Sequence, residues 1–182
     1  MDRQNVTQRI GFLGAGNMAE AMIRGLIQGQ IAPPERIRAS DVSAPRRELM
    51  EKTYGIRTTG DNLALVQDAE VLILAVKPQV AAAVMEAIRP AAGPDKLVIS
   101  IVAGLTTAAM AQRLPSGSRI VRTVPNTPVF VGAGMVAIAA GPGATPEDIS
   151  LAEALFGPVA RTAVLEERLM DAVLGVSGSG PG

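Results

Sequence analysis

A glycine-rich hexapeptide, GAGNMA at residues 14–19, stands near the N-terminus. It fits the pattern Gly-x-Gly-x-x-Gly/Ala and lies between the apolar run Ile10–Leu13 and a helical pattern, which is the context that this motif requires. Gly14 permits a tight turn from strand to helix, Gly16 lets the backbone approach a pyrophosphate, and Ala19 keeps the helix close to the sheet. The free N–H groups and the positive end of the helix dipole attract the anion. The hexapeptide therefore predicts a site for the diphosphate of a dinucleotide.

An acidic residue follows at the spacing expected for a ribose contact. Asp41 lies 22 positions beyond Ala19, directly after the predicted strand Ile37–Ser40. A carboxylate at this place accepts hydrogen bonds from the adenosine ribose and repels a 2′-phosphate, which favours NAD. Arg46 and Arg47 stand close by, and their guanidinium groups are suited to pair with a 2′-phosphate, which favours NADP. Asp41 is alternatively a helix N-cap, so the choice of cofactor stays open.

Elements that would position these residues alternate between short apolar runs and helical patterns. This alternation is typical of a parallel sheet with crossover helices, and it predicts an α/β fold with a doubly wound, Rossmann-type, mostly parallel sheet. The run Val71–Val76 lacks a polar face, so we expect it at the centre of the sheet. In the helix predicted from Arg46 to Tyr54, Leu49 is the expected apolar anchor. The predicted strands are 10–13, 37–40, 56–58, 71–76, 97–101, 120–123, 135–140 and 159–165, and the predicted helices are 17–29, 46–54, 62–66, 79–89, 106–114, 146–156 and 166–174.

Two domains are expected along the chain. Residues 1–165 carry the alternating elements of a dinucleotide-binding domain. Residues 166–182 begin a helical pattern and end in Ser-Gly-Ser-Gly-Pro-Gly, so we expect them to be the start of a helical domain that is cut short. Val173, Leu174 and Val176 are expected to leave an apolar edge exposed there.

Other strand ends also carry unusual residues, and ligands of an open parallel sheet bind at the carboxyl ends of its strands. Lys77 and Pro78 follow the buried run, where Lys77 is placed to project toward the site. Small residues at 101–104 let a nicotinamide ring lie against the backbone, and Pro125–Pro128 is a rigid polar loop. Ordinary loop chemistry explains each of these segments equally well.

Composition excludes several classes of protein. Lys and Arg number 17, Asp and Glu number 17, and aromatic residues make up 2%, so the basic patch and stacking surface of a nucleic-acid binder are missing. The absence of Cys and His excludes Ser-His-Asp and Cys-His hydrolases and removes the commonest zinc ligands, so we expect no metal site. We find no secretory signal and no membrane span, and we expect a soluble, cytoplasmic protein that binds neither nucleic acid nor membrane.

Motifs spread over nearly the whole chain resemble those of the pyrroline-5-carboxylate reductase family. In order, the matching pieces are residues 10–19 (IGFLGAGNMA), 61–62 (DN), 74–79 (LAVKPQ), 103–104 (AG), 125–128 (PNTP), 171–173 (DAV) and 177–181 (SGSGP). The last two are the most discriminating, since other Rossmann reductases share only the first fingerprint. The family continues Gly-Pro-Ala-Tyr where this chain has Gly-Pro-Gly.

The resemblance implies a reductase that uses NADPH or NADH to convert L-1-pyrroline-5-carboxylate to L-proline, the last step of proline synthesis. It also implies a homodimer that intertwines through the C-terminal helical domain. The family's threonine beside the substrate nitrogen falls beyond residue 182, so no catalytic residue is assigned. The cofactor contacts that it implies are Leu13, Gly14, Ala15, Gly16, Asn17, Met18, Asp41, Asn62, Ala75, Val76, Lys77, Pro78, Ile101, Val102 and Ala103.

A cyclic imine suits a chain without His. Its nitrogen can be protonated before reduction, so no oxyanion has to be stabilised, and orientation of the reactants provides most of the catalysis. The amides of Ser177, Gly178, Ser179 and Gly180 are suited to form a nest for the substrate carboxylate, or the segment is a flexible linker. Glu166 and Glu167 favour a cationic imine, or they are charges at a helix N-terminus.

Two other functions stay open from the sequence. One is an NAD(P)-binding module without turnover. The other is a different Rossmann reductase such as a β-hydroxyacid dehydrogenase, although the lysine that those enzymes place on a following helix is not visible here.

Overall fold

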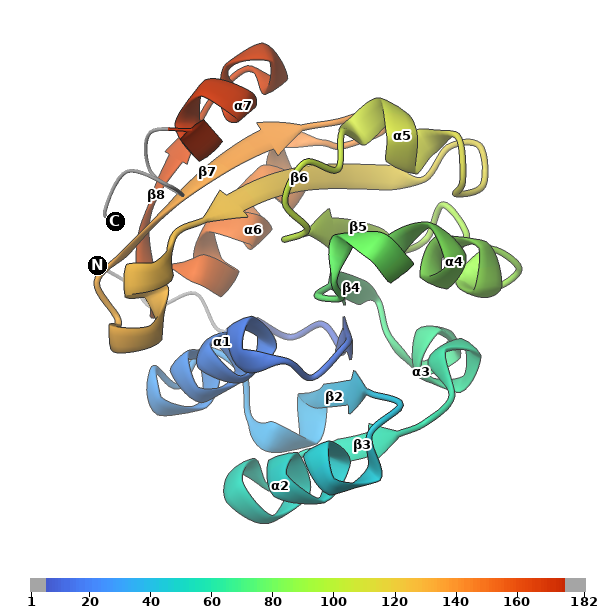
Figure 1. Ribbon diagram of the computed structural model, residues 1–182, viewed down its shortest axis with the longest axis vertical. Helices are drawn as coiled ribbons and strands as arrows, with labels where there is room; N and C mark the ends of the chain where they lie inside the picture. The colour runs from blue at the N-terminus through green and yellow to red at the C-terminus, as the bar shows by residue number, and fades with distance from the viewer. Residues whose placement is uncertain (1–5, 176–182) are drawn as a thin grey trace.

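A single twisted sheet with helices on both faces makes up the computed structural model, which describes residues 6–175 (Figure 1). The strand order is β3-β2-β1-β4-β5-β6-β7-β8. Neighbouring strands run parallel from β3 to β6, β7 is antiparallel to β6, and β8 is parallel to β7. The predicted doubly wound, mostly parallel Rossmann-type sheet is therefore confirmed.

The elements alternate along the chain as the sequence predicts. The strands are β1 (Ile10–Leu13), β2 (Ile37–Ser40), β3 (Arg57–Thr59), β4 (Val71–Leu74), β5 (Leu97–Ser100), β6 (Arg119–Pro125), β7 (Gly134–Ala140) and β8 (Ala160–Val164). The α-helices are α1 (Asn17–Gln28), α2 (Ala44–Tyr54), α3 (Asn62–Asp68), α4 (Pro78–Ile88), α5 (Thr107–Ala111), α6 (Pro146–Phe156) and α7 (Met170–Val173). The 3-10 helices are η1 (Pro34–Arg36), η2 (Thr127–Val131) and η3 (Glu167–Leu169).

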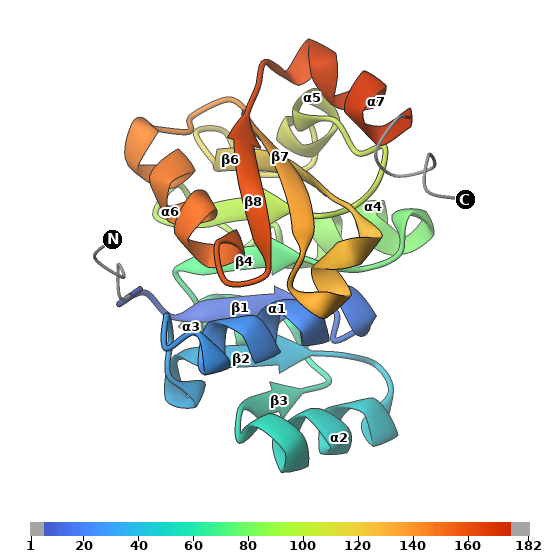
Figure 2. The same ribbon diagram turned by 90° about the vertical axis from the view of Figure 1, so that its left-hand side faces the viewer.

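Helices cover both faces of the sheet (Figure 2), and apolar side chains form a buried cluster between the helices and the sheet on each face. On one face α1, α2 and α6 bury side chains such as Met22, Met50 and Phe156. On the other face α3, α4 and α5 bury side chains such as Leu65 and Met85. Because both faces are covered, all four residues of β1, β4 and β5 are buried, which explains why their sequences lack a polar alternation.

The C-terminal helix packs on a smaller cluster at the β7 end of the sheet. Met170 is fully buried there with Val124 and Ala137, and Val173 and Leu174 pack against the same cluster half-buried. The expectation of an exposed apolar edge is therefore wrong in part for Val173 and Leu174, because the sheet covers one side of each. Val176 lies outside the described residues.

The predicted end of a helix at residue 54, the predicted start of one at residue 62 and both predicted ends of the helix 146–156 are confirmed, and local signals explain them. Asp61 accepts from the N–H groups of Leu63 and Ala64 and so caps α3, while Gly55 ends α2 in the left-handed region at φ +69°. Pro146 opens α6, as predicted. Caps and helix-ending glycines act within one turn of helix, so the sequence alone contains the information that fixes them.

Other element predictions were wrong. The anchor of α2 is the fully buried Met50, whereas Leu49 is 46% exposed, because one step along a helix turns a side chain by about 100°. The strand predicted over 71–76 ends at Leu74, and the helix predicted over 166–174 is a 3-10 turn followed by the short α7.

None of the helices between residues 6 and 175 has the length and apolar character needed to cross a membrane.

Candidate functional site

The bend between β1 and α1 strongly favours glycine at residue 14. Gly14 has φ +97°, and a Cβ added there would lie 2.6 Å from the carbonyl oxygen of Ala75. Its N–H donates to the carbonyl oxygen of Ser40 over 2.9 Å, and the N–H of Ala75 donates to the carbonyl oxygen of Leu13 over 2.8 Å. Gly14 is therefore wedged between the ends of β2 and β4.

Open space lies in front of Gly16, the N-cap of α1. Its backbone is extended at φ −67° and ψ −177°, and a Cβ added there would meet nothing within 4 Å. Glycine has no side chain to cap a helix, and no side-chain cap bond is found at this end of α1. The N–H groups of the first turn have no partner within the helix, so they are available to an anion that enters the open space. Gly14 is thus required by the fold, whereas Gly16 leaves room for a ligand.

Asp41 joins the end of β2 to residues 14–16, the bend at the predicted diphosphate site, which we call the phosphate loop. Its Oδ2 accepts from the N–H of Ala15 over 3.0 Å, and its Oδ1 accepts from the N–H of Ser43 over 2.9 Å. Ser43, whose hydroxyl accepts from the N–H of Arg46, is the N-cap of α2. The alternative in which Asp41 caps a helix is therefore wrong. Ala15 and Leu13 are fully buried, and the N–H of Ala15 is already donated to Asp41.

Behind the loop, Arg46, Glu20 and Tyr54 form a half-buried polar group. The Nε of Arg46 donates to the carbonyl oxygen of Ala15, and its Nη2 pairs with Glu20. The Tyr54 hydroxyl donates to Glu20 over 2.8 Å. Partial burial raises the pKa of Glu20, but the bonds from Arg46 and Tyr54 outweigh it and leave that pKa below 4.5. Burial, together with the bond to Glu20, raises the pKa of Tyr54 above 10.0.

The ends of the neighbouring strands reach the same edge of the sheet as the loop. The hydroxyl of Ser40 at the end of β2 donates to the amide oxygen of Asn62 over 2.6 Å, so Asn62 stands beside the loop. Ala75 and Val76 are half-buried, and Lys77 is the exposed N-cap of α4, with Pro78 next to it. After β5, Ile101 donates to Leu74 and Val102 donates to the Ser100 hydroxyl, whereas Ala103 is exposed. The strand ends carrying the predicted cofactor contacts are therefore gathered along one edge.

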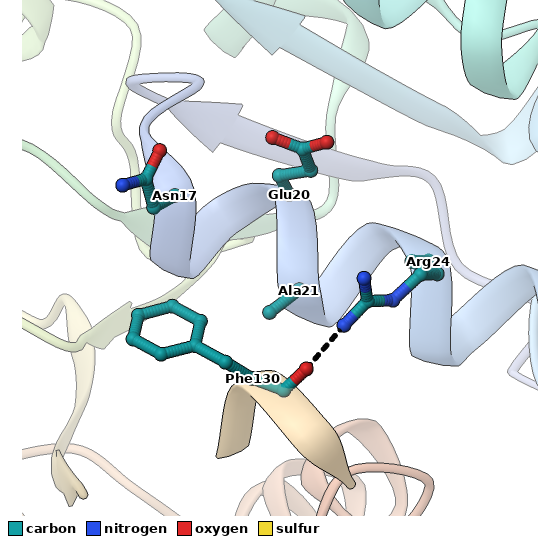
Figure 3. Close-up of a pocket in the computed structure, with 5 residues that line it drawn as sticks. All are labelled: Asn17, Glu20, Ala21, Arg24 and Phe130. Carbon is teal, nitrogen blue, oxygen red and sulfur yellow. Dashed lines mark hydrogen bonds between the residues drawn. The ribbon is translucent and has the colours of Figure 1, made fainter. Parts of the chain in front are cut away.

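A small pocket that the sequence did not predict opens beside the first turn of α1 (Figure 3). Its volume is about 260 Å³. The residues that line it come from α1 and η2 and are Asn17, Glu20, Ala21, Arg24 and Phe130. Arg24 donates to the carbonyl oxygen of Phe130 and so ties η2 to α1. The spacing of its four residues along α1 places them on one face of the helix, but the contribution of Phe130 depends on tertiary structure. The pocket is small for a whole dinucleotide, which would have to extend along the sheet edge.

The residues predicted to bind substrate are only partly described. Glu166 is exposed and pairs with Arg168 over 2.6 Å. Glu167 accepts hydrogen bonds from both the N–H and the hydroxyl of Thr107 and pairs with Arg122 at 3.4 Å. Arg122 is 1% exposed and also donates to Asp171 over 2.6 Å. Partial burial raises the pKa of Glu167, but the bonds from Thr107 and Arg122 outweigh it and leave that pKa below 4.5. Ser177, Gly178, Ser179 and Gly180 lie outside the described residues.

This cluster fastens the segment after β8 to the sheet, a role that neither interpretation of Glu167 from the sequence included. Within residues 6–175 we find no group of three or more His, Cys, Asp or Glu side chains that could hold a metal ion.

A mostly parallel sheet whose first strand turns through Gly14 into an uncapped helix, beside an acidic residue at the end of the second strand, defines a Rossmann-type dinucleotide-binding domain. The family described as NADP oxidoreductase, coenzyme F420-dependent, matches residues 9–104, and the chain belongs to that family.

Curated relatives carry a more specific name. The chain is 42% identical over 174 residues to the pyrroline-5-carboxylate reductase of Methanosarcina acetivorans, covering 96% of this chain and 64% of the relative. It is also 42% identical over 174 residues to the enzyme of that name from Synechocystis, covering 95% of this chain and 64% of the relative. The resemblance inferred from the motifs is therefore confirmed. The chain spans less than two thirds of the length of both relatives.

Solved structures of proteins with the same name resemble this fold closely. A pyrroline-5-carboxylate reductase from Coxiella burnetii superposes with a TM-score of 0.92 at 34% identity, covering 97% of this chain and 66% of that one. The Plasmodium falciparum pyrroline carboxylate reductase with NADP bound superposes with a TM-score of 0.86 at 26% identity, covering 97% of this chain and 64% of that one.

Proposed function

We propose that the chain is the coenzyme-binding part of a pyrroline-5-carboxylate reductase, which reduces L-1-pyrroline-5-carboxylate to L-proline with NADPH or NADH. The observation that carries the proposal is the open cradle at Gly16, in a chain whose curated relatives have this name. The reaction is the last step of proline biosynthesis, and we place it in the cytoplasm.

The residues present fit such a coenzyme. The first-turn amides of Asn17 and Met18 bind the diphosphate at the Gly16 cradle, and Asp41 accepts from the adenosine ribose. Asn62 and the segments 75–78 and 101–103 contact the rest of the coenzyme along the sheet edge. When bound, the reduced nicotinamide supplies a hydride.

The substrate makes modest demands on the protein. A protonated imine becomes a neutral amine when its carbon receives a hydride, so no oxyanion develops and no His is needed. The protein therefore has to orient the ring and exclude water. Glu166 and the amides of residues 177–180 are our candidates for holding the substrate.

We also propose that residues 1–165 are the dinucleotide-binding domain and that residue 166 begins a second, helical domain in which two copies of the chain associate. The buried Arg122 pairs with Glu167 and Asp171 across this boundary and supports a fixed join between the two parts.

Turnover tests the proposal directly. Purified protein is mixed with NADH or NADPH, and the loss of reduced-nicotinamide absorbance is followed when pyrroline-5-carboxylate is added. We expect oxidation only when the imine is present, and none with a β-hydroxyacid and the oxidised coenzyme. Binding of coenzyme without turnover would support the non-catalytic module instead, and activity on hydroxyacids would support the other reductase class.

A further inference from the structure

Asp41 has a fixed carboxylate at the point where the adenosine ribose of a dinucleotide lies. It follows β2 directly, and the register pairs Ser40 with Leu13, so Asp41 stands next to the bend at Gly14. Both of its oxygens are held by backbone N–H groups, at 3.0 Å from Ala15 and 2.9 Å from Ser43. A carboxylate held from both sides cannot turn away from an incoming ligand without losing these bonds.

The two neighbouring arginines do not neutralise this carboxylate. Arg46 is directed behind the loop, where it binds the carbonyl oxygen of Ala15 and pairs with Glu20. Through Nη1, Arg47 donates to the carbonyl oxygens of Asp41 and Val42, over 2.7 Å and 3.2 Å. In the part of the chain that the structure describes, no Lys or Arg forms an ion pair with Asp41.

Residues 41–43 of the loop after β2 carry no cation, and the guanidinium of Arg47 beside them is already bonded to the loop's carbonyl oxygens. Val42 is 94% exposed, and Ser43 is exposed beside it. A phosphate on the ribose 2′-oxygen would therefore meet the Asp41 carboxylate at a place where the loop presents an apolar side chain and a hydroxyl. Ribose hydroxyls, in contrast, would donate to the remaining lone pairs of the same carboxylate.

We infer that Asp41 selects the coenzyme that lacks the 2′-phosphate, so that the protein uses NADH in preference to NADPH. The inference rests on the proposed function, since it presumes that the loop at Gly14 binds a dinucleotide. It assigns the selectivity to one carboxylate and identifies Val42 as the position from which the selectivity can be changed.

Calorimetric titration of the protein with NADH and with NADPH tests the inference. We expect NADH to bind more tightly by about tenfold or more, the order expected when a phosphate dianion meets a carboxylate in water-like surroundings. Asp41→Asn should narrow this ratio severalfold. Asp95→Asn makes the same change of charge at the amino end of β5, on the opposite edge of the sheet, and should leave the ratio unchanged.

A second variant keeps the test independent of the hydrogen bonds of Asp41. Val42→Arg alters an exposed side chain and should tighten NADPH binding severalfold with little effect on NADH. Equal or tighter binding of NADPH by the unmodified protein would overturn the inference, and loss of that binding in Arg47→Gln would assign the phosphate to Arg47. If neither coenzyme bound, the proposed function would fail and the inference with it.

Discussion

Gly14 and Gly16 should respond in opposite ways to the same added methyl group. Gly14→Ala places a Cβ on a residue at φ +97° and 2.6 Å from the carbonyl oxygen of Ala75. Gly16→Ala places a Cβ in the empty cradle, on a residue with ordinary backbone angles. The first change should therefore destabilise the fold, and the second should block the coenzyme.

The magnitudes follow from the contacts. A left-handed conformation costs a non-glycine residue about 1–2 kcal/mol. Displacing the end of β4 weakens the bond from the N–H of Ala75 to Leu13, which adds about 0.5–1.5 kcal/mol. We therefore expect Gly14→Ala to lower the free energy of unfolding by about 2–3 kcal/mol. Gly16→Ala should cost less than about 1 kcal/mol, because alanine is only a poorer N-cap than glycine.

Urea denaturation measures the stability of both variants, and calorimetric titration with NADH measures binding by Gly16→Ala. We expect a lowered urea midpoint with an unchanged slope for Gly14→Ala. For Gly16→Ala we expect a near-normal midpoint with binding weakened tenfold or more. Normal coenzyme binding by Gly16→Ala would refute our placement of the diphosphate, and equal stability of the two variants would refute the role of Gly14.

Three further predictions concern the surroundings of the site. Because the folded-state pKa of Glu167 is lowered, the contribution of its carboxylate to stability is complete above pH 4.5 and is lost as the pH falls through the folded-state pKa. Glu167→Gln weakens the contact with Arg122, so its urea midpoint should be lower than that of the unmodified protein at neutral pH, and the two midpoints should converge in acid. A difference in urea midpoint that stays constant with pH would contradict this prediction. Tyr54→Phe removes the hydroxyl bonded to Glu20 and should cost about 1 kcal/mol by urea denaturation, and no loss would show that the bond contributes nothing. Asp61→Ala removes the cap of α3 and should cost about 1 kcal/mol in the same assay, with Asp61→Ser recovering most of it.

Residues whose structure is set within one turn of chain could be predicted from the sequence. The bend at Gly14, the cap at Asp61 and the end of α2 at Gly55 depend on backbone angles and bonds to near neighbours. The order of strands and helices also follows from local patterns. The assignment of Leu49 failed because α2 has only a few apolar residues, and either Leu49 or the adjacent Met50 was compatible with burial.

Contacts between distant segments could not be predicted in this way. Glu20 and Tyr54 meet across 34 positions, and Arg24 and Phe130 across 106. Apolar character misplaced the end of β4, because Ala75 and Val76 pack against the two apolar core clusters although they lie beyond the last residue of the strand. Asp41 directly follows β2, as predicted, but its bonds to two backbone amides could be found only in the structure.

Because β7 runs antiparallel to β6, no crossover helix is needed to connect these two strands. Since β6 and β7 are antiparallel, residues 126–133 connect them as a hairpin that starts and finishes on the edge where the strand ends gather. The connections that follow β1 to β5 at that edge each lead into a helix, so the packing of that helix constrains their length. Residues 126–133 are instead joined at both ends to strands, so the packing of a crossing helix does not fix their length. Differences in ligand preference among proteins of this fold should therefore accumulate in this hairpin.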